Sequence, residues 1–424
     1  MNQILLCLLA LLVAGASVRA DNWPAWRGPR GDGTSNEKNL PIHWDAKKNV
    51  TWKVPVAGIG HSSPIVWESR IFVTSCLEDS GKRVLICFDR DNGKQLWQRV
   101  VVESPLERKH SQNSRASSTP ATDGKYVFVT FLDITNKKEP TVQVACYDFD
   151  GKKIWQKSPG AFFSRHGFCS TPVLYKDKVI VNCDQDAIGK YRAYIVALDK
   201  ATGKEHWRID RPNRTRSYCA PLIRKASGKM QLVLSGSLCI TSYDPDTGKL
   251  HWIVNGPTEQ YVASPVWGEG VFFVTTGFPQ YHNIAIRPDG EGDVTNSHVV
   301  WHEKRVSKRD ASYVPSPIAW GKYFFLVSDV GLAHCFDAKT GKRLWANKLG
   351  KFHRSSPVEA NGLLYFLDDR GTTHVVKASR KFEVVARNGI GEKCYASPAI
   401  SDGQIFIRSW NHLWCIGLRT FVLE

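Results

Sequence analysis

The sequence predicts an all-β protein, an eight-bladed β-propeller with four-stranded blades. Three observations lead to this prediction. A turn that ends in tryptophan recurs along the chain, a small residue followed by proline opens eight successive units, and the last unit lacks a strand that a segment near the N-terminus can supply. Self-similarity with a period of a few tens of residues is typical of propellers and solenoids.

The recurring turn is clearest at residues 197–207, ALDKATGKEHW. Asp199 can accept hydrogen bonds from its own turn, and Gly203 supplies a position with positive φ at no steric cost. The tryptophan then begins the next strand, where its ring can lie against the glycine turn of a neighbouring blade. We interpret these rings as structural docking groups rather than as a sugar-binding or cofactor signature. The seven predicted docking tryptophans are Trp52, Trp97, Trp155, Trp207, Trp252, Trp301 and Trp345.

Each unit opens with a small residue and a proline before an apolar run. The intervals between openings are 40–56 residues, enough for the four short strands of one blade. The eight openings are Ser63-Pro64, Thr119-Pro120, Thr171-Pro172, Ala220-Pro221, Ser264-Pro265, Ser316-Pro317, Ser356-Pro357 and Ser397-Pro398.

Closure of the ring follows from the incomplete eighth unit. After Ser397 the chain has room for three strands only. Residues 49–56, NVTWKVPV, carry Trp52 where an outer strand would have its tryptophan. We therefore expect this N-terminal strand to complete the last blade, which leaves no free sheet edge at the seam. The seventh unit is degenerate, with Val385 in the place of the tryptophan.

These motifs resemble a known family. The pattern small-x-Asp-x-x-Thr-Gly-x-x-x-Trp is similar to the tryptophan-docking repeat of quinoprotein (PQQ-like) β-propellers. The phrases WPAWRGPRGDG, VPSPIAWG and YASPAISDGQIFIRS resemble secreted bacterial PQQ-like propeller proteins that are abundant in planctomycetes. More distantly, the repeat resembles the lipoprotein scaffold of the outer-membrane β-barrel assembly machine. The resemblance covers roughly residues 22–417 and implies the fold far more strongly than an activity.

The chain divides into three parts. Residues 1–20 have an apolar run that ends in Val18-Arg19-Ala20, which is typical of a cleaved signal peptide. Residues 21–48 form a polar, Gly/Pro-rich strap, whose Trp23 and Trp26 we expect to pack on the flank of the propeller; a docking peptide or ligand clamp is the alternative. Residues 49–424 form the propeller. We expect an exported protein, periplasmic or extracellular, without a transmembrane anchor.

The eleven cysteines are expected to be small buried side chains rather than disulfide partners. Cys87, Cys146 and Cys335 lie two residues before the motif aspartate, in equivalent slots of separate blades, too far apart to bridge. The sequence contains no CxxC, and the ligand spacing of a zinc site is absent, so we expect no metal site.

The net charge of +17 favours anionic partners such as acidic glycans, lipid head groups or an acidic protein surface. A lysine-rich, soluble surface is the simpler interpretation. No nucleic-acid motif appears, and we expect a monomer.

Loops before the blade openings are predicted to surround one mouth of the central channel. Nearly every blade contributes a cation, an imidazole or a phenol there, and convergent cations attract anions. Loops on a rigid scaffold often carry function, although loop residues are also polar by default. The predicted ligand-binding residues are His61, Arg115, Arg165, His166, Arg216, Tyr261, Arg309, Tyr313, His353, Arg354, Lys393 and Tyr395, accompanied by His110, Asn113 and Arg214.

We interpret the protein as a non-catalytic scaffold that binds an envelope protein, a peptide or an anionic glycan at this mouth. A PQQ-dependent dehydrogenase is the first alternative, and a polysaccharide-active enzyme is the second. The family resemblance implies that such dehydrogenases need a Ca²⁺ cage, a catalytic aspartate and usually a disulfide of neighbouring cysteines. None of these is recognisable in the sequence, so we predict no catalytic residues and do not expect PQQ, although a cationic ring could bind this tricarboxylate.

Overall fold

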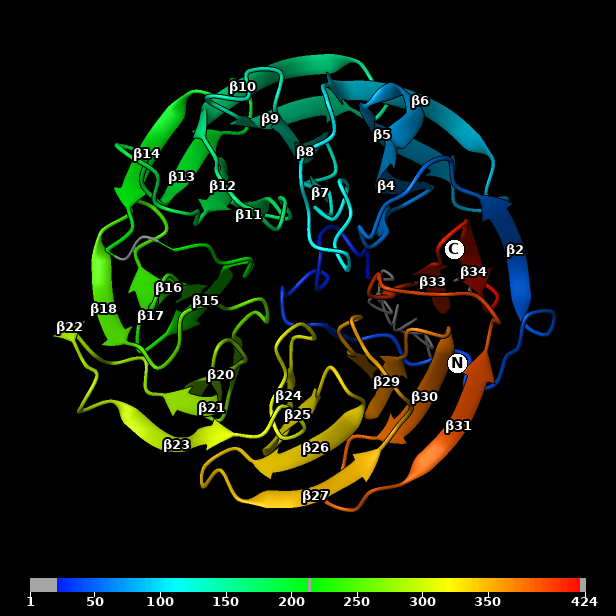
Figure 1. The fold of residues 1–424 in the computed structure, drawn as a ribbon. Helices are drawn as coiled ribbons and strands as arrows, with labels where there is room; N and C mark the ends of the chain where they lie inside the picture. The colour runs from blue at the N-terminus through cyan, green and yellow to red at the C-terminus, as the bar shows by residue number, and fades with distance from the viewer. Residues whose placement is uncertain (1–20, 213–214, 420–424) are drawn as a thin grey trace, which may run out of the picture.

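The computed structural model describes residues 21–212 and 215–419, and in that part of the chain eight sheets surround a central axis (Figure 1). The predicted all-β propeller with four-stranded blades is confirmed. Two sheets carry an additional two-residue strand at an edge. The helical content of the described ranges is one short turn, η1 (Glu78–Ser80), and no helix in them has the length and apolar character needed to cross a membrane. The predicted signal peptide, residues 1–20, lies outside the described residues.

Each blade runs from a short inner strand at the axis to an outer strand at the rim. Blade one consists of β3 (Ile65–Trp67), β4 (Arg70–Leu77), β5 (Lys82–Asp89) and β6 (Gln95–Glu103), and blade two of β7 (Ala121–Thr122), β8 (Tyr126–Asp133), β9 (Thr141–Asp148) and β10 (Lys153–Ala161). Blade three consists of β11 (Val173–Tyr175), β12 (Lys178–Cys183), β13 (Tyr194–Asp199) and β14 (Glu205–Asp210). Blade four consists of β15 (Leu222–Ala226), β16 (Lys229–Gly236), β17 (Cys239–Tyr243) and β18 (Leu250–Asn255), and β22 (Gly292–Asp293) adds to β18 in parallel. Blade five consists of β19 (Val266–Gly268), β20 (Val271–Thr276), β21 (Tyr281–Ile286) and β23 (Val299–Val306), and blade six of β24 (Ile318–Trp320), β25 (Tyr323–Val327), β26 (Leu332–Asp337) and β27 (Arg343–Lys348). Blade seven consists of β28 (Val358–Ala360), β29 (Leu363–Leu367), β30 (Thr372–Lys377) and β31 (Val384–Gly389), and β1 (Thr34–Ser35) adds to β28 in parallel. Blade eight consists of β32 (Ala399–Ser401), β33 (Gln404–Arg408), β34 (His412–Ile416) and β2 (Val50–Pro55).

The burial of the strands explains their sequence patterns. Middle strands such as β12 and β13 are buried along almost their whole length, because neighbouring blades cover both faces of the sheet. They read as continuous apolar runs. Outer strands such as β2 alternate between exposed and buried residues because one face meets water. The core is accordingly a ring of apolar clusters between successive blades rather than one central core.

The seam of the ring is closed as predicted. Strand β2 pairs antiparallel with β34 (Figure 1). In this pairing Trp52 lies opposite Cys415. Arg90 of blade one reaches across the seam, where its guanidinium donates to the carbonyl of Ser401 at 2.7 Å and to the side chain of Gln404 at 3.1 Å. The first blade and the last blade are therefore joined by side chains as well as by the shared strand.

The tryptophans dock on the next blade, as their position predicts. The indole N–H of Trp155 donates to the carbonyl of Lys200 at 2.9 Å, and its ring lies so close to Gly203 that a Cβ there would come within 2.7 Å. The indoles of five other tryptophans make the equivalent bond to the next turn. These tryptophans are Trp52, Trp97, Trp207, Trp301 and Trp345.

Trp252 is the exception. Its indole donates to the side-chain oxygen of Gln231 in its own blade at 2.9 Å, and the amide nitrogen of Gln231 donates to the carbonyl of Pro288 at 2.9 Å. Blade five has an insertion in place of the Asp-x-x-Thr-Gly turn, so a glutamine relays the contact. The prediction of direct docking is wrong for this residue.

The small residue at each blade opening has a physical role. The hydroxyl of each opening serine or threonine accepts a hydrogen bond from the backbone N–H of the opening residue in the preceding blade. The bond from Ser397 N–H to Ser63 Oγ, at 3.0 Å, closes the circle across the seam. Seven such bonds form within the described ranges, and we call them the hydroxyl ring; the eighth has no acceptor because residue 220 is alanine.

The strap, residues 21–48, crosses the face of the propeller opposite the loops that precede the blade openings. It makes polar contacts with six blades, including backbone bonds between Trp23 and Val66, an ion pair between Asp32 and Arg224, and the pairing of β1 with β28. Trp23 is buried, but Trp26 faces the channel axis. The expectation that both rings pack on the flank is therefore wrong, because the strap spans the axis.

Glu359 on β28 lies fully buried beneath the strap, and burial raises its pKa to about 8. One carboxyl oxygen accepts the N–H of Gly362 at 2.8 Å, while the other has no partner among the described residues. A carboxyl whose pKa is raised in the folded state favours folding at low pH. This contribution falls as pH rises from the unfolded pKa of about 4.3 to the folded value near 8.

We expect Glu359→Gln to be isosteric and to remove this pH dependence. The difference between the melting temperatures of the variant and the original chain should be small at pH 5 and should grow in favour of the variant up to about pH 8.5. Thermal unfolding of both proteins at pH 5, 7 and 8.5 measures it. An offset that does not change with pH would show that Glu359 ionises as freely as in the unfolded chain.

Candidate binding face

Loops on the face away from the strap surround a cavity on the propeller axis. Its volume is about 370 Å³, and every one of the eight loops before a blade opening contributes to its wall. We call it the central cavity. It is lined by His61, His110, Gln112, Asn113, Ser117, His166, Cys169, Tyr218, Gln260, Val262, Phe278, Tyr313, Val314, Arg354 and Tyr395.

One repeat position supplies a lining residue in all eight blades. The residue two places before the opening residue always faces the central cavity. In chain order these residues are His61, Ser117, Cys169, Tyr218, Val262, Val314, Arg354 and Tyr395. The hydroxyl ring fixes the backbone two residues later, so the same bond holds this position in seven blades; in blade three the N–H of Thr171 lacks it because residue 220 is alanine.

The strap closes the channel below the central cavity. A smaller space of about 120 Å³ continues toward the strap face and is lined by hydroxyls of the ring and by Trp26. Arg27, beside Trp26, is buried and donates to the carbonyls of Pro357 at 2.8 Å, Asp32 at 2.6 Å and Pro317. The strap, with Trp26, therefore lies on the axis on one side of the central cavity, and the loops lie on the other.

Burial shifts the pKa values of several groups that line the central cavity toward their neutral forms. Burial, reinforced by Arg408 and nearby lysines, lowers the pKa of His61 to about 3. Burial also lowers the pKa of His166 and raises that of the Cys169 thiol to about 12. Burial likewise raises the pKa of the Tyr313 phenol above its ordinary value. This phenol donates a hydrogen bond to Oε1 of Gln260 at 3.2 Å. Apart from Arg354, which forms an ion pair with Asp369, the cavity wall is mainly aromatic and hydrogen-bonding.

Three of the predicted cations are neutralised by partners distant in the sequence. Arg115 pairs with Glu78 at 2.5 Å, and Arg216 pairs with Asp186 at 2.6 Å. Arg354 pairs with Asp369 and lies over the ring of Tyr395. The prediction of a ring of unbalanced positive charge is therefore wrong for Arg115, Arg216 and Arg354.

The structure brings some of the predicted residues together and separates others. His61, His166, Tyr313, Arg354 and Tyr395 line the central cavity, as do His110 and Asn113. Arg165 and Arg216 line a second pocket nearby. Arg214 lies outside the described residues.

Five predicted residues line neither space. Tyr261 is buried and its hydroxyl donates to Gly256 at 2.7 Å, and His353 is buried as well. Arg115 is held by its carboxylates, and Arg309 is exposed on the β23–β24 loop. Lys393 lies behind the wall, 3.9 Å from the ring centre of Trp410. The prediction that these five line the mouth is wrong: burial or another partner holds four of the side chains away, and Arg309 lies in an exposed loop that lines neither space.

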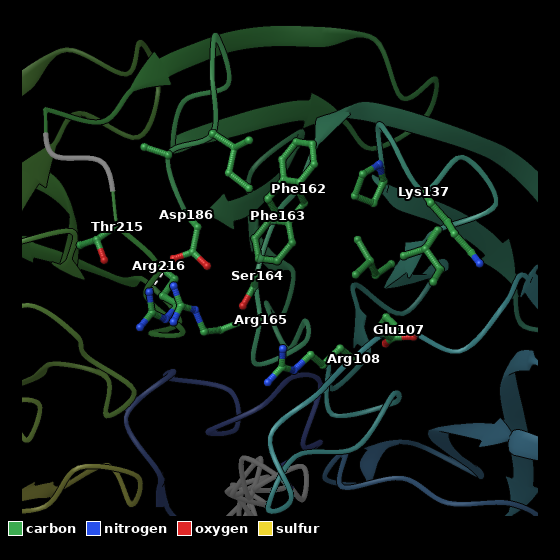
Figure 2. Close-up of a pocket in the computed structure, with 15 residues that line it drawn as sticks. Glu107, Arg108, Lys137, Phe162, Phe163, Ser164, Arg165, Asp186, Thr215 and Arg216 are labelled. Atoms are coloured by element: carbon green, nitrogen blue, oxygen red, sulfur yellow. Dashed lines mark hydrogen bonds and ion pairs between the residues drawn. The ribbon is translucent and has the colours of Figure 1, made fainter.

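The second space, which we call the off-axis pocket, has a volume of about 580 Å³ and lies between the loops of blades two and three (Figure 2). It adjoins the central cavity where Ser164 Oγ lies 3.1 Å from the hydroxyl of Tyr218. Apolar side chains and cations share its wall. The apolar residues are Leu132, Ile134, Pro140, Phe162, Phe163, Ala187 and Ile188, and the cations are Arg108, Lys137, Arg165 and Arg216.

The charges of the off-axis pocket are unbalanced. Asp186 forms an ion pair with Arg216 (Figure 2), and Glu107 forms one with the buried Arg83. Within residues 21–212 and 215–419, neither Arg108 nor Arg165 has a hydrogen bond or ion pair through its side chain. Two guanidinium groups therefore remain available beside an apolar floor.

The donor set of the central cavity fits a quinone cofactor poorly. Its lining holds amides and phenols but no aspartate or glutamate, whereas the Ca²⁺ that accompanies PQQ requires carboxylate oxygens. A general base of the carboxylate type is likewise absent from the lining residues, and the two histidines with lowered pKa have no carboxylate to orient them.

Comparisons with known proteins agree with the fold. BamB from Moraxella catarrhalis superposes with a TM-score of 0.58 at 13% identity, over 88% of this chain and 99% of that one. The quinohemoprotein alcohol dehydrogenase of Comamonas testosteroni gives 0.65 at 12% identity, over 95% and 82%. A europium-containing methanol dehydrogenase gives 0.60 at 14% identity, over 92% and 90%. No curated protein matches by sequence.

The family described as outer membrane protein assembly factor BamB matches residues 34–137, 109–276 and 293–381, which together span well over half of the sequence. These matches include strands of all eight blades, among them β2 of the last blade, and the tryptophan turns described above. The chain belongs to this family of PQQ-like β-propellers.

Proposed function

We propose that the protein is an exported, non-catalytic scaffold that binds an acidic peptide segment of a protein partner on the loop face. The observation that carries the proposal is the off-axis pocket, in which the guanidinium groups of Arg108 and Arg165 flank an apolar floor formed around Phe163. An apolar anchor side chain in a pocket supplies most of the affinity of such interfaces, and flanking charges set the choice of partner.

The arrangement favours a peptide over a glycan. A glycan would need hydroxyl and carboxylate partners, yet the acids of this pocket are occupied by Arg83 and Arg216. The aliphatic residues Leu132, Ile134 and Ile188 suit a hydrophobic side chain. Export is part of the proposal because it rests on the apolar N-terminal run and on the family, in which one member is described as an outer membrane assembly factor.

Fluorescence anisotropy with labelled acidic peptides tests the proposal. The probes are peptides rich in aspartate with one central leucine or phenylalanine, and the same peptides with alanine at the centre. We expect the apolar residue to be required. We expect Arg108→Glu combined with Arg165→Glu to weaken binding at least about tenfold, because like charges then face the ligand.

The matched control places the same charge change on the opposite face. Arg380 and Lys381 are exposed in the turn between β30 and β31, and their replacement by glutamate should leave binding unchanged. Binding that ignores the central side chain but follows the charge, or binding of heparin oligosaccharides in place of the peptides, would favour a glycan ligand and contradict the proposal. Dye-linked alcohol oxidation after reconstitution with PQQ and Ca²⁺ would contradict its non-catalytic part.

A further inference from the structure

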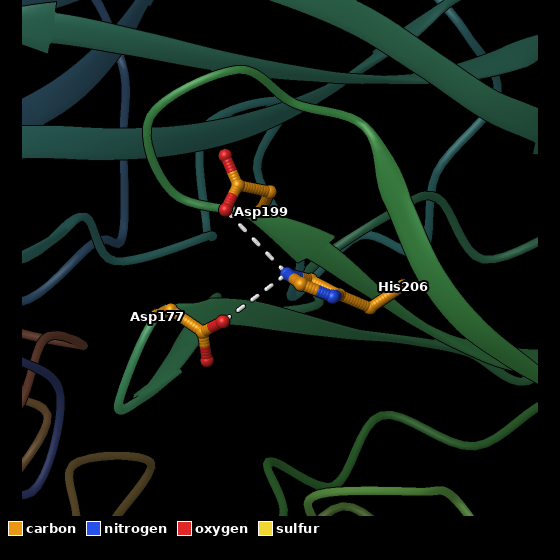
Figure 3. Close-up of side chains that lie close together, drawn as sticks. All are labelled: Asp177, Asp199 and His206. Carbon is orange, nitrogen blue, oxygen red and sulfur yellow. Dashed lines mark ion pairs between the residues drawn. The ribbon is translucent and has the colours of Figure 1, made fainter.

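A cluster of three metal-ligating side chains lies on blade three, away from the binding face. His206 on β14 points between Asp177, in the β11–β12 turn, and Asp199, at the end of β13 (Figure 3). Their ligand atoms all lie within 4.8 Å of one another. The equivalent turns of blades one, seven and eight touch the strap, so the cluster belongs to the strap side of the propeller.

The distances suit a shared cation better than direct hydrogen bonds. Nε2 of His206 is 3.5 Å from an oxygen of Asp177 and 3.5 Å from an oxygen of Asp199. Good N–H···O bonds are about 2.7–3.2 Å long. Two ligands on one tetrahedral zinc ion, each about 2.1 Å from the metal, are about 3.4 Å apart.

In each carboxylate one oxygen accepts hydrogen bonds from neighbouring residues, and the other lies toward the imidazole of His206. Oδ1 of Asp199 accepts the turn N–H of Thr202 at 2.8 Å and its hydroxyl at 2.7 Å, and Oδ1 of Asp177 is 2.7 Å from the ammonium of Lys178. In both residues it is Oδ2 that lies toward His206. The hydrogen-bonded oxygens hold the two carboxylates in place, so the three ligand atoms need little reorganisation to bind an ion.

The internal repeat shows that the fold does not require these residues. At the position of Asp177, which precedes the residue that faces the motif aspartate, three other blades have glycine: Gly270, Gly362 and Gly403. At the position of His206, most other blades have an aliphatic residue: Leu96, Ile154, Val300 and Leu344. Only the motif aspartate is a general feature of the turn. Blade three therefore departs from the repeat at two positions, and both departures add a ligand to one cluster.

We propose that Asp177, Asp199 and His206 form a binding site for a divalent transition-metal ion, with Zn²⁺ or Cu²⁺ favoured over Mg²⁺ or Ca²⁺. One imidazole with two carboxylates is a ligand set for borderline metals rather than for hard cations, which prefer oxygen alone. The remaining coordination position faces water, because the side chain of Asp177 is 55% exposed and that of His206 is 32% exposed. This site is independent of the proposed peptide binding on the other face.

Blade four provides a natural control. His251 occupies the position of His206, and Asp244 the position of Asp199, but Met230 stands at the position of Asp177. The imidazole of His251 instead contacts the carbonyl of Met230 at 3.2 Å. Blade four therefore holds two of the three ligands in the same framework.

Isothermal titration of the full chain with Zn²⁺ at pH 7.5 tests the proposal, with Mg²⁺ as the hard-cation control. We expect one Zn²⁺ per chain and no Mg²⁺ binding. His206→Ala and Asp177→Gly should each weaken zinc binding at least about tenfold. Asp177→Gly restores the residue of the sister blades, so the variant should fold, and His251→Ala should bind zinc as the original chain does.

Electron paramagnetic resonance with Cu²⁺ gives an independent readout, in which the original chain should show one coordinated imidazole nitrogen and His206→Ala none. The proposal is overturned if no Zn²⁺ binds, if His206→Ala keeps the affinity, or if His251→Ala loses as much affinity as His206→Ala.

Discussion

Replacing Trp52 by alanine is expected to destabilise the propeller by about 4 kcal/mol, because the change removes a buried ring at the only point where the circle is closed by two ends of the chain. The ring of Trp52 lies against Gly93, where a Cβ would come within 2.8 Å, and its centre is 6.1 Å from that of Phe406. Its indole N–H also donates to the carbonyl of Arg90 at 2.8 Å, which would lose its partner.

The measurement is the free energy of unfolding from urea titration, with Trp320→Ala as the matched control. Trp320 lies on β24 and its side chain is exposed, so its loss should change the free energy by less than about 1 kcal/mol. Limited proteolysis adds a local readout, since opening of the seam should expose β34 to cleavage first. Equal stability of the two variants would mean that the seam is not held by Trp52.

The fold could be predicted because its determinants are local and repeated. The glycine turn and its tryptophan lie within eleven residues of chain, and the repetition reveals which features matter. The seam was predictable for the same reason, since Trp52 stands in a strand that lacks a partner in its own neighbourhood. Trp252 could not be placed correctly because its departure depends on an insertion in the next blade and on Gln231, which no pattern marks.

The path of the strap could not be predicted, because its contacts are not repeated. Arg27 binds backbone carbonyls of Pro317 and Pro357, some 290 and 330 residues away, and a carbonyl carries no sequence signature. The sequence likewise does not show which cations are neutralised by ion pairs. Arg354 is a cation in the sequence, but its carboxylate partner Asp369 arrives from the next blade's β29–β30 turn.

The candidate site was predictable in location but not in detail. Choosing cations, imidazoles and phenols by type identified the correct loops, yet it missed Tyr218 and included the buried Tyr261. Counting two residues back from each opening would have identified eight lining residues, Tyr218 among them. The register of a repeat is fixed by backbone hydrogen bonds, so it predicts where a side chain points better than its chemical type does.

Arg27→Ala is expected to cost about 3–5 kcal/mol of folding free energy and to release the strap. The guanidinium is buried and donates to three carbonyls, two of which belong to the opening prolines of blades six and seven. Removing the guanidinium leaves buried carbonyl acceptors without donors, and each unsatisfied acceptor costs about 1–3 kcal/mol of folding free energy. It also opens the space that the side chain fills beside Gly33. Arg27→Lys should be almost as damaging, since one ammonium cannot reproduce the planar fork with which the guanidinium reaches three separate carbonyls.

Arg30→Ala is the matched control for the strap. Arg30 lies three residues further along, but its side chain bonds only to Thr34 and Asp21 within the strap, so its loss should cost less than about 1 kcal/mol. Hydrogen exchange separates release of the strap from general destabilisation. In Arg27→Ala the N–H of Glu359, which donates to Gly33 at 2.9 Å, should lose protection while the amides of β12 and β13 keep theirs. If Arg27→Ala and Arg30→Ala unfold alike and protect Glu359 alike, then the strap is held by the sum of its small contacts and Arg27 is not its anchor.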